Sequence, residues 1–375
     1  MIEYNLASVV GARPNFMKMA PLLRAFQHYP HVKTTLIHTG QHYDQNLSEI
    51  FFQELGMKQP DVNLEVGSGK HGAQTGQVLE RLEAVLDQGP PGGAKFDRVL
   101  VVGDVNSTMA ATLAAVKLGI RVAHVEAGLR SCDRSMPEEI NRLVTDSIAD
   151  LLLVSEPAGI ENLRREGHAN GAMHLVGNVM IDTLLWLLPQ ARSRDTLTRY
   201  GLQSGGYGVV TLHRPTNVDT AKTLSALLDV LVETSRQLPL VFPVHPRTRR
   251  RIEEFGLCSK FQESRLVDLP PLGYLDFLAL TSQAAVIVTD SGGLQEESTA
   301  LGIPCLTARP NTERPITVEE GTSTLVGNNP DQLRGCLRDV LDGTYKRGRC
   351  PALWDGHAAE RIAKLIAEEN RLAGG

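Results

Sequence analysis

Short apolar runs alternate with longer stretches of helical periodicity along the chain. Such runs are typical of strands buried on both faces of a parallel sheet, and the stretches between them are typical of the helices that cover it. This alternation predicts an α/β fold with helices on both faces of its sheets. The predicted strands are Leu6–Val10, Thr34–His38, Arg98–Val102, Arg121–Val125, Leu151–Val154, Val209–Leu212, Val241–Val244, Leu266–Leu269, Val286–Thr289 and Cys305–Thr307.

The number of strand–helix units exceeds what one sheet of ordinary size holds, so we predict two doubly wound, Rossmann-like domains. The hinge is expected between Gly177 and the glycine-rich segment 204–208, which gives an N-terminal domain over 1–177 and a C-terminal domain over 178–356. A last helical stretch, about 357–372, follows, and the sequence leaves open whether it packs back on the first domain. Further helices are predicted at Met17–His28, Ser107–Lys117 and Glu138–Ala149.

Composition narrows the class of protein. The chain has 375 residues, 42% of them hydrophobic and 22% charged, as in an ordinary globular protein of about two domains. A net charge of −5 argues against a general nucleic-acid binder. The five scattered cysteines form no Cys-x-x-Cys pair, which favours a reducing cytoplasm over a disulfide framework. No apolar stretch suits a membrane span, and the first eleven residues do not resemble a signal peptide.

Two turns, one in each predicted domain, share a pattern. The segments 103–107 and 290–293 each follow an apolar strand, contain an aspartate with small residues, and open a helix. In open parallel sheets the ligand lies beyond the carboxyl ends of the strands. Two such domains facing each other would form an interdomain cleft lined by these turns.

The second of these turns, Asp290-Ser291-Gly292-Gly293, is a candidate phosphate site. Glycines let backbone N–H groups approach an anion, and the helix N-terminus adds its dipole. The alternative is an ordinary tight turn in which Ser291 caps the helix. Glu297, in the following turn of helix, either complements the helix dipole or accepts hydrogen bonds from ribose hydroxyls.

Cationic side chains stand near other strand ends. Arg13 follows the first strand, and a guanidinium is the natural bidentate partner of a phosphate. Lys18 lies about one turn into the next helix, and Arg314 lies in a loop. His213 and His245 each end a predicted strand in the second half. Each of these residues has an equally plain interpretation as a surface or structural group.

Three carboxylates occupy strand ends or helix starts. Asp104 and Glu126 each follow a buried apolar run, and Glu138 follows Pro137 at the start of a helix. Three acids converging on one site would suit proton transfer on a sugar. The alternative for Glu138 is a first-turn acid paired with Arg142 four residues later.

Some motif matches carry little weight. Segment 67–72 fits the letters of a dinucleotide-binding motif but lacks a convincing strand before it and an acid about twenty residues on. His38 and His42 straddle Thr39-Gly40 and so do not share a helix face as zinc ligands would. We therefore expect neither a nicotinamide cofactor nor a metal.

Taken together and in order, eight segments resemble the non-hydrolysing UDP-N-acetylglucosamine 2-epimerases. Any one of them is weak, but the ordered set is specific, and the resemblance as a whole runs from residue 5 to about 327. The segments are GARPNFMK at 11–18, HTGQHYD at 38–44, GDVNST at 103–108, HVEAGLR at 124–130, PEEINR at 137–142, TLHRP at 211–215, TDSGGLQEE at 289–297 and TERP at 312–315.

The resemblance implies a GT-B-like fold, a UDP-sugar held between two domains, a homodimer, and inversion at C2 without a cofactor. It implies catalytic positions at Asp104, Glu126, Glu138, His213, Lys18 and Arg142. It also implies UDP-sugar-binding positions at Arg13, His213, His245, Ser291, Gly292, Gly293, Glu297 and Arg314.

The sequence departs from the family pattern at three places. Asn15 replaces a common glutamate, Pro215-Thr216 replaces a common Arg-Glu, and segment 41–46 differs from the version associated with an allosteric substrate site. Allosteric activation by substrate is therefore not expected.

Several alternatives stay open: C2 epimerisation of a related UDP-sugar such as a 2,3-diacetamido uronic acid, hydrolytic release of UDP and N-acetylmannosamine, a GT-B glycosyltransferase, and a non-catalytic nucleotide-sugar sensor. Deuterium uptake at C2 without loss of UDP would separate epimerisation from the others.

Overall fold

The computed structural model describes residues 3–40, 52, 54–90, 92, 94–262 and 264–373. These residues form two compact units, one drawn from Met1–Thr183 and Ala352–Gly375 and the other from Leu184–Pro351. The boundaries expected from sequence, 177/178 and 356/357, remain a prediction.

The described part of unit 1 is built on a seven-stranded sheet in the order β3-β2-β1-β4-β5-β6-β7. All neighbouring strands run parallel. Most of these strands are runs of apolar residues, which are buried on both faces of a parallel sheet only when helices cover each face. The strands are β1 (Tyr4–Val10), β2 (Val32–His38), β3 (Val62–Asn63), β4 (Arg98–Val102), β5 (Arg121–Ala127), β6 (Leu151–Val154) and β7 (Met173–Leu175).

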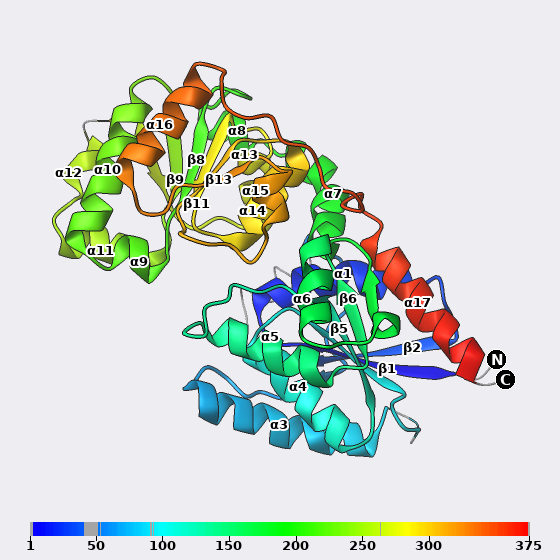
Figure 1. Ribbon diagram of the computed structural model, residues 1–375. Helices are drawn as coiled ribbons and strands as arrows, with labels where there is room; N and C mark the ends of the chain where they lie inside the picture. The colour runs from blue at the N-terminus through cyan, green and yellow to red at the C-terminus, as the bar shows by residue number, and fades with distance from the viewer. Residues whose placement is uncertain are drawn as a thin grey trace. The chain divides into compact units, whose positions relative to one another are not determined.

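Helices cover both faces of this sheet. The helices α3, α4 and α5 lie in a row on one side, and α1 and α17 pack together on the other (Figure 1). Leu82 and Leu86 of α3 and Ala114 of α4 join Val9 and Val99 in one buried cluster. The helices of unit 1 are α1 (Arg13–Phe26), α3 (His71–Gln88), α4 (Asn106–Lys117), α5 (Pro137–Ile148), α6 (Pro157–Arg165) and α17 (Ala358–Ala373), and α7 (Val179–Arg192) runs from unit 1 into unit 2.

The last helix, α17, is bound to the first sheet by an ion pair with a buried arginine. Arg98, at the start of β4, is 1% exposed, and its guanidinium donates two hydrogen bonds to Glu369, Nη2 to Oε1 at 3.0 Å. Arg121 of β5 reaches the same carboxylate at 3.3 Å. At the other end of α17, Asp182 accepts hydrogen bonds from the N–H groups of Ala358 and Ala359. Both ends of α17 are therefore fixed to unit 1.

The described part of unit 2 repeats this architecture with a six-stranded parallel sheet in the order β10-β9-β8-β11-β12-β13. Alternate residues of its strands enter two cores: Val210 packs with Leu228 and Leu337, and Val209 packs with Leu294 on the opposite face. The strands are β8 (Gly208–Thr211), β9 (Leu240–Pro243), β10 (Leu266–Leu269), β11 (Val286–Thr289), β12 (Cys305–Thr307) and β13 (Ser323–Leu325). The helices are α8 (Thr196–Arg199), α9 (Pro215–Val218), α10 (Ala221–Ser235), α11 (Pro246–Glu254), α12 (Ser259–Gln262), α13 (Tyr274–Thr281), α14 (Gly292–Leu301), α15 (Ile316–Glu319) and α16 (Pro330–Leu341).

The predicted α/β class with two doubly wound, Rossmann-like sheets is confirmed. Strands Arg98–Val102, Leu151–Val154, Leu266–Leu269, Val286–Thr289 and Cys305–Thr307 have the predicted bounds. The strand β7 ends just before Gly177, where a strand-like segment is expected to end. The short strands β3 and β13 and the helix α3 were not predicted.

Candidate active site

Strand order reverses between β1 and β4 in unit 1 and between β8 and β11 in unit 2. Ligands of doubly wound sheets bind at such switch points, beyond the carboxyl ends of the strands. Most of the candidate residues follow these strands or begin the next helix. Each unit is therefore considered at its own switch point.

In unit 1, Asn15 ties the two turns of the switch point together. Its Oδ1 accepts hydrogen bonds from the N–H groups of Gly11 and Ala12, both at 3.0 Å, and its Nδ2 donates to the carbonyl of Val102 at 3.0 Å. Asn15 is 2% exposed. The residue that departs from the family pattern therefore fixes the turn after β1 against the turn after β4.

Four of the predicted catalytic residues form one charge cluster beside these turns. The Arg142 guanidinium binds Asp104 Oδ2 at 2.7 Å and Glu126 Oε2 at 3.2 Å through Nη2, and the Glu126 carbonyl at 2.8 Å through Nη1. Lys18 donates to the same Glu126 oxygen. Arg142, Glu126 and Lys18 are 1%, 3% and 6% exposed, whereas the Asp104 side chain is 26% exposed. Asp104 is thus the member of the cluster most open to a ligand.

A bulge in β5 aims Glu126 at this cluster. The pairing of β5 with β6 shifts register between Val125 and Ala127, so Glu126 is the extra residue of the strand. Its φ is +73°, in the left-handed region that a residue with a Cβ seldom adopts. Such conformations cost about 1–3 kcal/mol and concentrate at functional sites.

Glu138 is close in sequence to Arg142 but, unlike the buried members of the cluster, its side chain is exposed. It is exposed in the first turn of α5, four residues before Arg142 and therefore on the same helix face. Its neighbour Glu139 is 4% exposed and accepts hydrogen bonds from Ser131 and the Cys132 N–H. Glu139 is thus engaged in holding a loop, whereas the Glu138 carboxylate faces solvent.

In unit 2, His213 and Asp290 join the two turns of the switch point. His213 Nδ1 lies 2.7 Å from Asp290 Oδ1, and Asp290 Oδ2 accepts from the N–H groups of His213 and Arg214 at 2.9 and 2.8 Å. Burial would raise the pKa of Asp290, but these contacts and a hydrogen bond from Asn217 lower it below its ordinary value. Because the Asp290 carboxylate binds Nδ1–H, Nε2 of His213 is left as the nitrogen that can face a ligand.

His245 lies beside this pair. Its ring centroid is 5.6 Å from that of His213. Nδ1 of His245 accepts the N–H of Arg247 at the start of α11, which fixes the proton on Nε2. Burial, together with the neighbouring positive groups His213 and Arg247, lowers the pKa of His245.

The N-terminus of α14 has the features of an anion site. Ser291 occupies the cap position, yet its side chain accepts no hydrogen bond from the helix in the described structure. A Cβ on Gly292 would lie 2.8 Å from Nη1 of Arg314 and 3.6 Å from Nη1 of Arg309, so both guanidiniums flank the first turn. Buried glutamates hold them in place: Glu296 ion-pairs with Arg314 at 2.7 Å, and Glu313 binds both arginines. Backbone N–H groups with two fixed guanidiniums suit a diphosphate.

Glu297 lies one turn further along α14. It is 5% exposed, and Tyr274 donates a hydrogen bond to it at 3.0 Å. Burial raises the pKa of Glu297 to about 7, against the lowering effect of the Tyr274 hydrogen bond.

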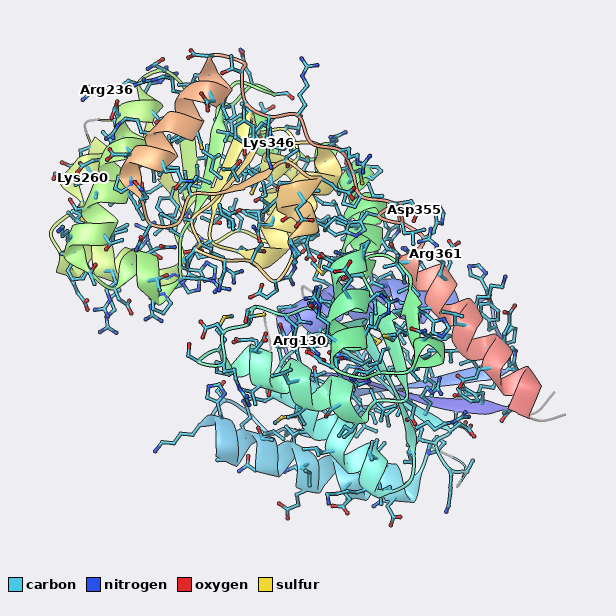
Figure 2. The ribbon with its side chains drawn as sticks, viewed as in Figure 1. Arg130, Arg236, Lys260, Lys346, Asp355 and Arg361 are labelled. Carbon is cyan, nitrogen blue, oxygen red and sulfur yellow. The ribbon has the colours of Figure 1, made fainter. Side chains whose placement is uncertain are left out.

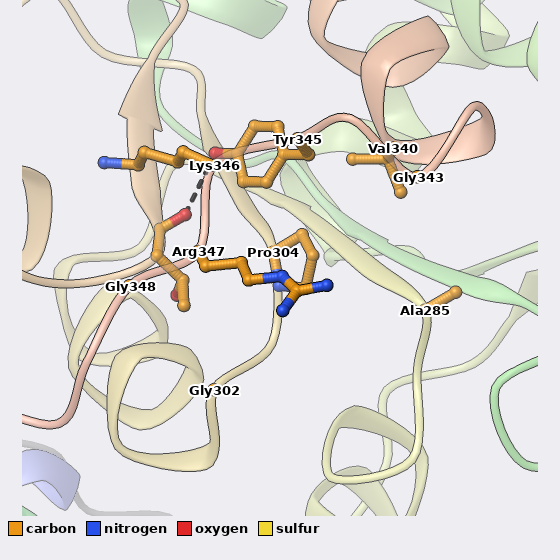
Figure 3. A pocket seen from close by; sticks show the side chains of 10 residues that line it. Ala285, Gly302, Pro304, Val340, Gly343, Tyr345, Lys346, Arg347 and Gly348 are labelled. Carbon is orange, nitrogen blue, oxygen red and sulfur yellow. Dashed lines mark hydrogen bonds between the residues drawn. The ribbon is translucent and has the colours of Figure 1, made fainter.

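A pocket of about 400 Å³ in unit 2 lies at the opposite ends of the strands (Figure 3). Ala285, Pro304 and Thr322, which line it, directly precede β11, β12 and β13. Helices α14 and α16 end there, so partly negative carbonyl groups face it, and Lys346 and Arg347 complement them. This pocket therefore does not suit a diphosphate, which would instead bind at the N-terminus of α14.

The structure brings together Lys18, Asp104, Glu126 and Arg142 in unit 1 and His213, His245, Gly292 and Arg314 in unit 2. The Arg13 side chain and segment 41–46 lie outside what the structure describes. Sequence reasoning missed Arg309, Asn217 and Tyr274, whose positions carry no local pattern. It also missed the role of Glu313, which lies in the segment TERP beside Arg314. Across the described residues, no cluster of three or more His, Cys, Asp or Glu side chains is placed to hold a metal ion, and no helix is long and apolar enough to span a bilayer.

Two doubly wound sheets with charged turns at both switch points define a GT-B-like enzyme of the kind that acts on nucleotide sugars. The family model described as UDP-N-acetylglucosamine 2-epimerase matches residues 24–367. The chain therefore belongs to the UDP-N-acetylglucosamine 2-epimerase family, as its motifs predict.

Relatives and solved structures agree with this assignment. A UDP-N-acetylglucosamine 2-epimerase of Methanococcus maripaludis is 39% identical over 98% of this chain and 100% of its own. A UDP-2,3-diacetamido-2,3-dideoxy-D-glucuronate 2-epimerase of Pseudomonas aeruginosa is also 39% identical, over 97% of this chain and 99% of its own. The UDP-GlcNAc 2-epimerase of Methanocaldococcus jannaschii, solved in complex with UDP-GlcNAc and UDP, has a TM-score of 0.85 and 39% identity, covering 97% of this chain and 99% of that one.

Proposed function

We propose that this protein interconverts UDP-N-acetylglucosamine and UDP-N-acetylmannosamine by eliminating UDP and adding it back, without hydrolysis. Unit 2 binds the UDP moiety, and the charge cluster of unit 1 performs proton transfer at C2.

The unit 2 residues have complementary roles towards UDP. The diphosphate is received by the N–H groups of Gly292 and Gly293 at the start of α14 and by the Ser291 hydroxyl. Arg314 and Arg309 neutralise its charge. His213, oriented by Asp290, and His245 donate to its oxygens. Glu297 accepts hydrogen bonds from the ribose hydroxyls, for which it must be ionised. Arg13, by its motif position, adds a further cation.

The order of bond breaking in the proposed epimerisation follows from the low acidity of the C2 proton. Beside an acetamido group this proton is held tightly, and it becomes removable as the C1–O bond breaks and C1 gains positive charge. The bonding electrons of C1–O leave with UDP, and those of C2–H form the C1=C2 double bond of a glycal. The return of a proton to the opposite face of C2, with attack of UDP oxygen on C1, gives the epimer. Cations that stabilise departing UDP therefore lower the barrier to both directions.

The observation that carries this proposal is the position of Arg142 between Asp104 and Glu126. One guanidinium holds two carboxylates side by side at the carboxyl ends of adjacent strands. Two acid–base groups are what inversion requires, since one face of C2 must lose a proton and the other must gain one. Glu138 is the third candidate, because its exposed carboxylate shares a helix face with Arg142.

The test is proton NMR of UDP-N-acetylglucosamine incubated with the protein in D₂O. Epimerisation replaces the C2 proton by deuterium and keeps the UDP linkage. Free UDP that accumulates in proportion to turnover would indicate hydrolysis instead. Transfer to an added acceptor with no deuterium at C2 would indicate a glycosyltransferase, and binding of UDP without either reaction would indicate a sensor.

A second candidate is the same reaction on a UDP-2,3-diacetamido uronic acid. It is favoured by the Pseudomonas aeruginosa relative, whose identity of 39% equals that of the Methanococcus maripaludis enzyme. Measuring C2 exchange with both donors at equal concentration decides between them, because the preferred substrate has the larger kcat/KM.

We further propose a cytoplasmic homodimer that supplies an activated sugar for polysaccharide synthesis, with a domain hinge between about Gly177 and Gly206. Light scattering after gel filtration at micromolar concentration measures the mass, and a mass close to 40.9 kDa would refute the dimer.

A further inference from the structure

The turn between β4 and α4 is held by hydrogen bonds to its backbone on several sides. Gly103, with φ of +69°, donates its N–H to Val125, and its carbonyl accepts from His124 Nε2 at 2.8 Å. Asn141 donates to the carbonyl of Asp104 at 2.8 Å. The Asp104 carboxylate therefore extends from a turn whose peptide groups are held from β5 and α5.

This turn also lies against the other half of the charge cluster. A Cβ on Gly103 would lie 2.9 Å from Lys18 Nζ and 3.4 Å from Glu126 Oε2. A displacement of the Gly103 peptide would therefore alter the contacts of both carboxylates that Arg142 joins.

His124 faces an acceptor at each ring nitrogen. Nε2 meets the Gly103 carbonyl at 2.8 Å, and Nδ1 meets Asp146 Oδ1 at 2.6 Å. A carbonyl oxygen can only accept, so Nε2 donates to the turn. The ring is 0% exposed, so the protein and not water contacts both ring nitrogens.

Asp146 holds the other ring nitrogen. Its Oδ2 accepts the N–H of Gly128 at 3.0 Å and lies 2.7 Å from Arg130 Nη2. Burial would raise the pKa of Asp146, but His124 and Arg130 lower it to about 2, which keeps it a carboxylate. Arg130 (labelled in Figure 2) in turn binds Glu166 through two hydrogen bonds at 2.8 and 2.7 Å. The Asp146 carboxylate that contacts His124 is therefore itself held by Gly128 and Arg130.

We propose that His124, held by Asp146, is a positioning residue that fixes the Gly103 carbonyl and through it the geometry of Asp104 and Glu126 during proton transfer. This inference rests on the proposed function. The alternative is that His124 and Asp146 only fasten α5 to β5. That alternative predicts a loss of stability, and no selective loss of the chemical step.

The test compares His124→Gln with His124→Leu. Glutamine can place an N–H near the position of Nε2, whereas leucine fills similar space without a donor. We expect His124→Leu to lower kcat for C2 deuterium exchange about 100-fold, the effect of a misplacement on the order of 1 Å. The Kd for UDP should stay within about twofold, since its proposed contacts are in unit 2. His124→Gln should recover most of kcat, and His174→Gln, on the edge strand β7, serves as the control.

Equal losses of kcat in the glutamine and leucine variants, or a loss of UDP affinity that parallels kcat, would overturn the inference. If His124→Leu does not fold, the ring itself is measured in the wild-type protein labelled with ¹⁵N-histidine. A proton on Nε2 that is hydrogen-bonded to the Gly103 carbonyl is expected for His124, and an Nε2 without that hydrogen bond overturns the inference. A wild-type protein that shows this hydrogen bond but no C2 exchange with any UDP-sugar would instead refute the proposed function.

Discussion

Replacement of Glu126 by glutamine separates the structural role of the charge cluster from its chemical one. The amide keeps the size of the side chain but removes the negative charge that Lys18 and Arg142 share. Lys18, 6% exposed, is then left beside a neutral group. Removal of one partner from a buried ion pair costs about 3–5 kcal/mol, and we expect the lower value because Arg142 keeps Asp104.

A loss of about 3 kcal/mol corresponds to a fall in Tm of roughly 6–12 °C for a unit of this size. The same variant should lose C2 exchange by a factor of about 10²–10⁴, the usual contribution of a general acid or base. Thermal unfolding followed by near-UV circular dichroism measures the first quantity, and proton NMR in D₂O, at a temperature where the variant is folded, measures the second.

Two further variants make the interpretation decisive. The double variant Glu126→Gln/Lys18→Met removes the unpaired cation, so Tm should recover while exchange stays low. Glu139→Gln, a buried acid that binds Ser131 and Cys132, should lower Tm with exchange within a few-fold of wild type. The reasoning is refuted if Glu126→Gln exchanges at the wild-type rate, or if the double variant regains activity along with stability.

Three other outcomes follow from ion pairs and pKa shifts in the structure. Burial raises the pKa of Glu297 from 4.5 to about 7, so the stability that the protonated side chain contributes is complete below pH 4.5 and is lost as the pH rises to about 7. In urea unfolding, the free energy of unfolding of the wild type should therefore fall by up to about 3 kcal/mol over this pH range. The Glu297→Gln variant should not show this fall. Asp290→Asn should weaken UDP binding about tenfold in calorimetry, because a hydrogen bond to a charged group that orients His213 is lost; unchanged affinity would contradict the anion site. Glu369→Gln should destabilise unit 1 by about 2 kcal/mol, since Arg98 loses its ionic partner, while Glu368→Gln should not. Equal urea midpoints for the two variants would argue against a stabilising ion pair between Arg98 and Glu369.

Much of the fold could be predicted because buried parallel strands are continuous apolar runs. Arg98–Val102 and Val286–Thr289 are such runs, and the turn residues that follow them mark their ends. The strand β3 is two residues long and lies at the edge of the sheet that the described residues form, paired with β2, so it contains no apolar run that would predict it. In α3, Gly72 and Gly76 interrupt the helical pattern near the start of the helix, so the sequence did not predict it.

The candidate site divides in the same way. Asp104, Glu126, His213 and Ser291 could be predicted because they stand at the ends of recognisable strands. The groups that fix them could not, because each partner comes from a distant part of the chain. His124 and Asp146 are 22 residues apart, and Asn217 and Asp290 are 73 apart. Such pairs leave no periodic signal in the sequence.

The ion pair between Arg98 and Glu369 has a consequence for synthesis on the ribosome. These residues are separated by 271 positions, and all of unit 2 is made between them. At about 5–20 residues per second, Arg98 waits roughly 15–50 s for its partner. During that interval the nascent first sheet exposes the surface that α17 will cover, so chaperones have their best opportunity to bind there before the chain is released.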